Sequence, residues 1–151
     1  MKELLERYPM LESCKTDIES AVNLMLDTYR RGGKILICGN GGSCADSDHI
    51  VGELMKGFLL RREVGDDFLE KLKKVNPENA DYMQKNLQGS LPAISLPAQS
   101  AILSAFANDV DADMVYAQMV YGYGNENDLL IGLSTSGNSK NVVYAAQIAK
   151  A

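Results

Sequence analysis

The sequence KILICGNGGS, residues 34–43, decides the fold class of this chain. Its short apolar run is typical of a strand that is buried on both faces. The strand leads directly into a glycine-rich loop, and a helix is expected to begin near Cys44 and to end near Lys56, before Gly57. A buried strand, a small-residue loop and a helix in this order indicate an α/β protein.

The segments on either side continue the alternation of helix and strand. An apolar stripe over residues 16–29 predicts a helix that begins with a capping box formed by Thr16 and Glu19. Further strands are expected at 92–96 and 128–133, with helices at about 98–107, from a corner at Asn108 and Asp109 to about 121, and from about 140. Strands separated by helices predict a three-layer α-β-α sandwich with a parallel sheet and flavodoxin-like winding.

One stretch departs from this alternation. Residues 59–91 are rich in charged and amide side chains, with helical patterns near 67–74 and 78–87, which indicates a solvated helical insertion. The rest of residues 1–151 forms a single domain. Only three strands are visible and the last helix reaches Ala151 without a cap, so we expect the domain to be incomplete, with its C-terminal strands missing.

Composition excludes several classes of protein. The chain has 151 residues and a net charge of -5, with no block of either sign, which argues against direct nucleic-acid binding. No apolar run is long enough for a membrane span and no signal peptide is recognisable, so a cytoplasmic location is expected. Three cysteines without CxxC spacing indicate neither a disulfide framework nor a zinc ribbon, and the single histidine, His49, excludes a site built from two histidines of this chain.

Two loops are candidate phosphate sites, because each follows a buried strand and starts a helix. The first is GNGGS at 39–43, and the second is STSGNS at 134–139, whose four hydroxyl residues could surround a phosphate monoester. The alternative interpretation is ordinary turn and N-cap chemistry. Neither loop has the lysine of a P-loop, and Cys44 stands where a dinucleotide fingerprint needs glycine, so no nucleotide cofactor is expected.

The helix after the first loop carries Asp46, His49 and Glu53 at helical spacing on one face. A carboxylate beside a bound sugar phosphate could move a proton between adjacent carbons, as aldose–ketose isomerisation through an enediolate requires. The alternatives are a surface carboxylate for Glu53 and a partly buried, hydrogen-bonded side chain for His49.

Three segments together resemble the sugar isomerase (SIS) domain family, and within it the sedoheptulose 7-phosphate isomerase (phosphoheptose isomerase) branch. They are ILICGNGGSCADSDHIVGEL at 35–54, FANDVDADMVYAQMV at 106–120 and LLIGLSTSGNS at 129–139. The resemblance implies an intramolecular oxidoreductase that converts sedoheptulose 7-phosphate into D-glycero-D-manno-heptose 7-phosphate, in heptose and lipopolysaccharide biosynthesis. It also implies a homotetramer that binds a phosphorylated sugar.

The resemblance assigns roles to particular residues. Glu53 matches the catalytic glutamate, and His49, with Glu53, matches a position that ligates zinc in some members. Asn108 and Asp109 match a pair near the subunit boundary that helps to order the site, and they are included among the implied substrate-binding residues. The implied substrate- and phosphate-binding residues of the two loops are Asn40, Gly41, Gly42, Ser43, Ser134, Thr135, Ser136 and Ser139.

The resemblance also implies what this sequence lacks. Family members continue through a segment that supplies a second catalytic residue, a histidine, and further metal ligands, so activity is expected only when that segment is present and zinc would have an incomplete ligand set here. An alternative is a non-catalytic phosphosugar-binding SIS protein, or a scaffold similar to the DnaA initiator-associating protein. Such scaffolds generally lack the glutamate matched by Glu53 and have arginine in place of Ser136, so both positions favour the isomerase.

Overall fold

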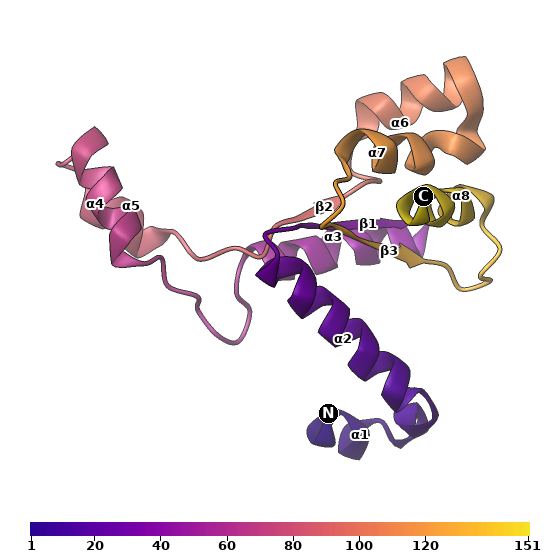
Figure 1. Cartoon of the computed structure of the whole chain (residues 1–151), viewed down its shortest axis with the longest axis horizontal. Coiled ribbons are helices and arrows are strands. Elements are labelled where there is room, and N and C mark those ends of the chain that lie inside the picture. The colour runs from indigo at the N-terminus through magenta and orange to yellow at the C-terminus, as the bar shows by residue number, and fades with distance from the viewer.

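A computed structural model describes all 151 residues, and it contains a three-stranded parallel sheet with helices on both faces (Figure 1). The strands are β1 (Ile35–Gly39), β2 (Ala93–Ser95) and β3 (Leu129–Leu133), and their order across the sheet is β2-β1-β3. This is the order in which flavodoxin-like winding begins. The predicted α/β class, parallel sheet and winding are therefore confirmed.

The helices follow the strands as the alternation predicts. Helices α7 and α8 pack against each other over one face of the sheet, whereas α3 packs on β1 and β2 from the other face. No helix combines the length and the apolar character that crossing a bilayer needs. The helices outside residues 59–91 are α1 (Lys2–Arg7), α2 (Lys15–Arg30), α3 (Gly42–Met55), α6 (Ser100–Phe106), α7 (Val115–Tyr123) and α8 (Lys140–Lys150).

Strand β1 is the centre of the core, and every one of its residues is buried. Its alternate side chains point to opposite faces. Leu36 and Cys38 join the main apolar cluster under α7 and α8, while Ile35 and Ile37 fill the other face. The predicted burial on both faces is thus confirmed, and it fixes the position of the loop that follows β1.

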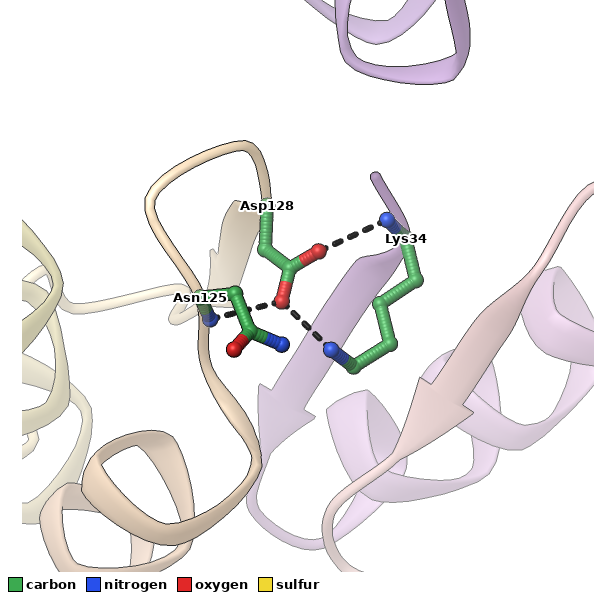
Figure 2. Close-up of polar contacts among 3 residues, drawn as sticks. All are labelled: Lys34, Asn125 and Asp128. Carbon is green, nitrogen blue, oxygen red and sulfur yellow. Dashed lines mark hydrogen bonds and ion pairs between the residues drawn. The ribbon is translucent and has the colours of Figure 1, made fainter. Parts of the chain in front are cut away.

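A buried carboxylate ties the starts of β1 and β3 together (Figure 2). Asp128 accepts hydrogen bonds from the backbone N–H of Lys34 at 2.8 Å and from that of Asn125 at 2.8 Å, and it lies 2.5 Å from the Lys34 Nζ. Only 8% of the Asp128 side chain is exposed. Burial alone would raise the pKa of Asp128, but these hydrogen bonds lower it below its ordinary value.

Two helices, α4 (Asp66–Val75) and α5 (Ala80–Asn86), lie in the stretch expected to be a helical insertion, and they project away from the sheet (Figure 1). Arg62, which precedes α4, links this stretch to the rest of the domain. Its guanidinium donates to the carbonyl of Leu54 at the end of α3 and to that of Gly89, both at 2.6 Å.

The expected capping box at the start of α2 was wrong. The helix begins at Lys15, and no side chain caps it. A 3₁₀ turn over Pro9–Cys14 runs directly into α2, so Thr16 already lies inside the helix, where its backbone carbonyl accepts from the Ser20 hydroxyl at 2.8 Å. A capping residue needs non-helical backbone angles, which Thr16 does not have at this position.

The expected corner at Asn108 and Asp109 lies a little further along the chain. Both residues continue the helical path through a π-helical turn, Ala107–Asp111. The backbone becomes extended at Asp111 (φ -162°, ψ 124°), whose carboxylate accepts from the N–H of Asp113 at 2.7 Å. Asparagine and aspartate favour turns, but three residues of that type stand within 108–111, and their identity alone does not select the one that bends the chain.

Candidate functional site

The register of the sheet brings the two small-residue loops together. In the parallel pairing of β1 with β3, Gly39 lies opposite Leu133. The next residues, Asn40 and Ser134, therefore begin the two loops at the same level of the carboxyl edge, on neighbouring strands about 4.8 Å apart. This edge is where open α/β sheets bind their ligands.

The hydroxyl groups of the second loop converge. The Ser134 Oγ lies 3.2 Å from the Ser139 Oγ and 3.5 Å from the Ser136 Oγ. It also accepts from the N–H of Gly137 at 3.1 Å. Thr135 is exposed in the same loop. Hydroxyls donate as well as accept, so this cluster can rearrange to give several donors to one oxyanion.

Neither helix that leaves these loops is capped by the residue that precedes it. Gly41 precedes α3 with a positive φ of 56°, and Ser139 precedes α8 without a capping hydrogen bond from its side chain, although the Val142 N–H in the first turn of α8 donates to the Asn141 Oδ1 at 3.0 Å. The N–H groups of a first helical turn have no partner inside the helix, and the helix dipole places partial positive charge there. Gly42 and Ser43 lie in the first turn of α3, so the two loops present two such helix ends at one edge.

A pair of side-chain amides links the loops directly. The Asn40 Nδ2 donates to the Asn141 Oδ1 at 2.9 Å, and the Asn141 Nδ2 donates to the Asn40 Oδ1 at 3.0 Å. Tyr116 of α7 supports the pair from the core: its hydroxyl donates to the Gly39 carbonyl at 2.8 Å and lies 3.3 Å from the Asn40 Oδ1.

Asn141 and Tyr116 have no recognisable signal in the sequence. Asn141 is the second residue after the second loop and has the pattern of an ordinary helical residue, and Tyr116 has the pattern of a core residue. The surroundings of Tyr116 are unusual: burial first, and then the nearby Cys38 and Cys44 thiols, raise its pKa to about 12. Its hydroxyl therefore keeps its proton and remains a donor at neutral pH.

Helix α3 brings its acidic face to the same edge. An open hollow of about 490 Å³ is lined by Asp46, His49 and Glu53 together with Leu133, the residue immediately before the second loop. The His49 Nε2 lies 3.5 Å from the Glu53 Oε1, and 44% of the Glu53 side chain is exposed. The predicted shared face is confirmed, and Glu53 is open to a ligand in this hollow.

Zinc bound by His49 and Glu53, with an incomplete ligand set in this chain, stays a prediction. Zinc sites use at least three protein ligands, and the structure gathers no group of three histidine, cysteine, aspartate or glutamate side chains that could hold a metal ion. His49 and Glu53 could supply two of these ligands.

The expected boundary pair is not joined to either loop. The Asn108 Nδ2 donates to the Asp109 Oδ1 at 2.7 Å, and neither side chain bonds to a residue of the two loops. Both residues are exposed. Their role at a subunit boundary stays a prediction.

The sheet, its winding and the paired loops define an α/β domain with a candidate ligand site at the carboxyl ends of its parallel strands. The family model described as SIS domain matches residues 1–85, more than half of the chain. The chain therefore belongs to the SIS domain family.

The chain is similar in sequence to curated proteins named phosphoheptose isomerase. A phosphoheptose isomerase of Helicobacter pylori (strain P12) is 38% identical over 149 residues, which is 99% of this chain and 63% of the relative. A phosphoheptose isomerase of Akkermansia muciniphila is 33% identical over 147 residues, 97% of this chain and 64% of the relative. The chain thus spans somewhat less than two thirds of the length of these relatives.

Solved structures agree with the fold. The structure of the phosphoheptose isomerase GmhA from Neisseria gonorrhoeae superposes with a TM-score of 0.63 at 29% identity, covering 99% of this chain and 68% of that one. A phosphoheptose isomerase from Francisella tularensis gives a TM-score of 0.64 at 26% identity, over 99% of this chain and 71% of that one.

Proposed function

We propose that this chain is the phosphosugar-binding portion of a phosphoheptose isomerase, which interconverts sedoheptulose 7-phosphate and D-glycero-D-manno-heptose 7-phosphate. The observation that carries the proposal is the single edge shared by the hydroxyl cluster of residues 134–139, the N-terminal ends of α3 and α8, and Glu53. The names of the relatives support it.

In this proposal the two ends of the substrate have different partners. The phosphate binds at the second loop, where Ser134, Ser136 and Ser139 have clustered hydroxyls and α8 begins. Hydroxyls and backbone N–H groups hold a phosphate monoester without the permanent charge of a lysine, which suits a group that must also be released. The sugar carbons then extend toward the first loop and the hollow under Glu53.

Glu53 is the proposed base. Its carboxylate takes a proton from C1 of the ketose and returns it to C2, while a hydroxyl proton passes from O1 to O2, so the intermediate is an enediolate and the atoms balance. The negative charge that develops on the sugar oxygens needs hydrogen-bond donors, and the first loop and its helix end can supply them.

The oligomeric state and cell location belong to the same proposal. A homotetramer would cover apolar side chains that the single chain leaves in water along α2, where Val22 is 46%, Leu24 54% and Leu26 45% exposed. The expected cytoplasmic location and the place in heptose and lipopolysaccharide biosynthesis follow from the proposed reaction.

The direct test measures turnover of sedoheptulose 7-phosphate by the protein expressed from its complete reading frame. Glu53→Gln should lower kcat by about 10²–10⁴-fold, because it removes a general base. Inorganic phosphate should bind that variant about as well as the wild type, since the phosphate loop is unchanged. Glu63→Gln is the matched control, because Glu63 is an exposed carboxylate in the insertion.

Two results would contradict the proposal. Normal turnover by Glu53→Gln would remove Glu53 from the reaction. A wild-type protein that binds phosphate but converts no sugar phosphate would favour the non-catalytic SIS class instead.

A further inference from the structure

We propose that Asn141 and Tyr116 are positioning residues that hold the Asn40 amide across the two loops, so that Asn40 meets the ligand with an N–H donor and not with its oxygen. This inference deepens the proposed function and rests on it. It concerns a link between residues 101 positions apart in the chain.

The orientation of the Asn141 amide is decided by the backbone. The N–H of Val142 is shared between the Ser139 carbonyl at 3.0 Å and one atom of that amide at 3.0 Å, and only the amide oxygen can accept from it. The other amide atom of Asn141 must then be the nitrogen, which donates to Asn40 at 3.0 Å. The α8 backbone thus fixes which way both amides face.

The oxygen of Asn40 is consequently already in use. It accepts from the Asn141 Nδ2, and the Tyr116 hydroxyl lies 3.3 Å away on the core side. The Asn40 nitrogen uses one of its two hydrogens on the Asn141 Oδ1 at 2.9 Å. One N–H of Asn40 therefore has no partner in the chain, and Asn40 is itself exposed at the edge of the site.

Tyr116 gives the pair a rigid support. It is 3% exposed, belongs to the main apolar cluster and binds the carbonyl of Gly39, the last residue of β1. A hydroxyl fixed to the strand end and close to the Asn40 oxygen opposes rotation of that amide.

The uncommitted N–H suits a ligand oxygen that is negative or becomes negative. A sugar carbonyl that turns into an enediolate oxygen is such a group, and a donor fixed before the reaction stabilises it without reorganisation. If Asn40 turned its oxygen to the ligand instead, it would repel the same charge.

The test is a double-mutant cycle on kcat/KM for sedoheptulose 7-phosphate. Asn141→Ala should lower kcat/KM by about 10–10²-fold, because the Asn40 donor loses its position. Tyr116→Phe, which keeps the ring, should lower it by about 3–10-fold, as expected for one hydrogen bond. If Asn141 acts through Asn40, the double variant Asn40→Ala/Asn141→Ala should be no slower than Asn40→Ala alone.

Phosphate binding, as a second measurement, distinguishes a positioning role of Asn141 from a purely structural role in α8. Binding of inorganic phosphate should change less than about twofold in Asn141→Ala, because the hydroxyl cluster of the second loop does not involve Asn141. The matched controls are Gln147→Ala, an exposed amide on α8, and Tyr121→Phe, an exposed tyrosine on α7. Both controls should retain wild-type kcat/KM.

Additive losses in the cycle, or phosphate binding that falls as far as kcat/KM, would overturn the inference. Failure of the proposed function would be seen separately, as a wild type without turnover. In that case the exchange of the Asn40 side-chain NH₂ protons with water, measured by NMR, still decides: one protected proton that loses its protection in Asn141→Ala supports the link, and two equally fast-exchanging protons in the wild type refute it.

Discussion

The buried carboxylate of Asp128 allows a quantitative test of how the sheet is held together. It accepts two backbone hydrogen bonds and pairs with the Lys34 ammonium, and each hydrogen bond to a charged group contributes about 1.5–3 kcal/mol. Asp128→Asn keeps the shape but has one accepting oxygen in place of two. We expect it to lower the free energy of unfolding by about 2–4 kcal/mol, and Lys34→Met, which leaves both backbone bonds, by only about 1–2 kcal/mol.

Urea unfolding at fixed protein concentration measures both changes. With a slope of about 2 kcal/mol/M, the Asp128→Asn midpoint should fall by about 1–2 M. Glu126→Gln is the matched control, because this exposed carboxylate lies in the same turn and forms no ion pair in the structure. An Asp128→Asn midpoint within error of the wild type would refute the reasoning.

The difference in the free energy of unfolding between the wild type and Asp128→Asn should also depend on pH, which supplies an independent check. Because hydrogen bonding outweighs burial and lowers the pKa of Asp128 in the folded state, the carboxylate contributes stability above the unfolded pKa of about 3.9. That contribution is lost as the pH falls through the lower, folded-state value. The gap between wild type and Asp128→Asn should be constant from pH 7 to about 5 and shrink below about 4. A gap that stays the same in acid would show that the charge is irrelevant.

Three further predictions concern other parts of the molecule. Arg62→Met should lower the free energy of unfolding by about 1.5–3 kcal/mol and make the 59–91 segment more sensitive to proteases, because it removes one hydrogen bond that joins this segment to α3 and one that joins the two ends of the segment at Gly89. Burial raises the pKa of the Cys38 thiol to about 11, so a thiol reagent at pH 8 should label the exposed Cys14 quickly and Cys38 only on unfolding, as mass spectrometry of peptides will show. Gly33→Ala should destabilise the fold strongly in thermal melts, because its Cβ would lie 2.0 Å from the backbone oxygen of Asn127.

Much of the fold was predictable because its signals are local. The apolar runs of β1 and β3 are short, are followed by loops of small residues and are rich in leucine and isoleucine, which is the composition of a strand inside a parallel sheet. Most predicted helices lie within about two residues of their expected bounds, but the helix expected to follow Asn108 and Asp109 begins only at Val115, after a π-helical and a 3₁₀ turn. The failed capping box shows the limit: Thr16 and Glu19 have the right spacing, but the 3₁₀ turn before them is set by Pro9 and its neighbours.

The candidate site was only half predictable, for a different reason. The two loops could be recognised because each has its own composition and its own strand and helix. The Asn40–Asn141 pair has no such signal, because it exists only through the register that sets Gly39 opposite Leu133. The role of Tyr116 could not be predicted for the same reason, since its hydroxyl reaches the Gly39 carbonyl only because α7 packs at the end of β1.

The separation of the paired amides also bears on folding kinetics. Contacts between distant residues form slowly, because a long loop must close before they contribute free energy. The two halves of the site are 101 residues apart, and β1 can pair with β3 only after the intervening segment of the chain, which includes α3 and α7, has been synthesised. During synthesis on the ribosome, the first loop therefore has no partner until residues 134–150 have emerged, and the two-loop site should form well after β1 and α3 have been synthesised.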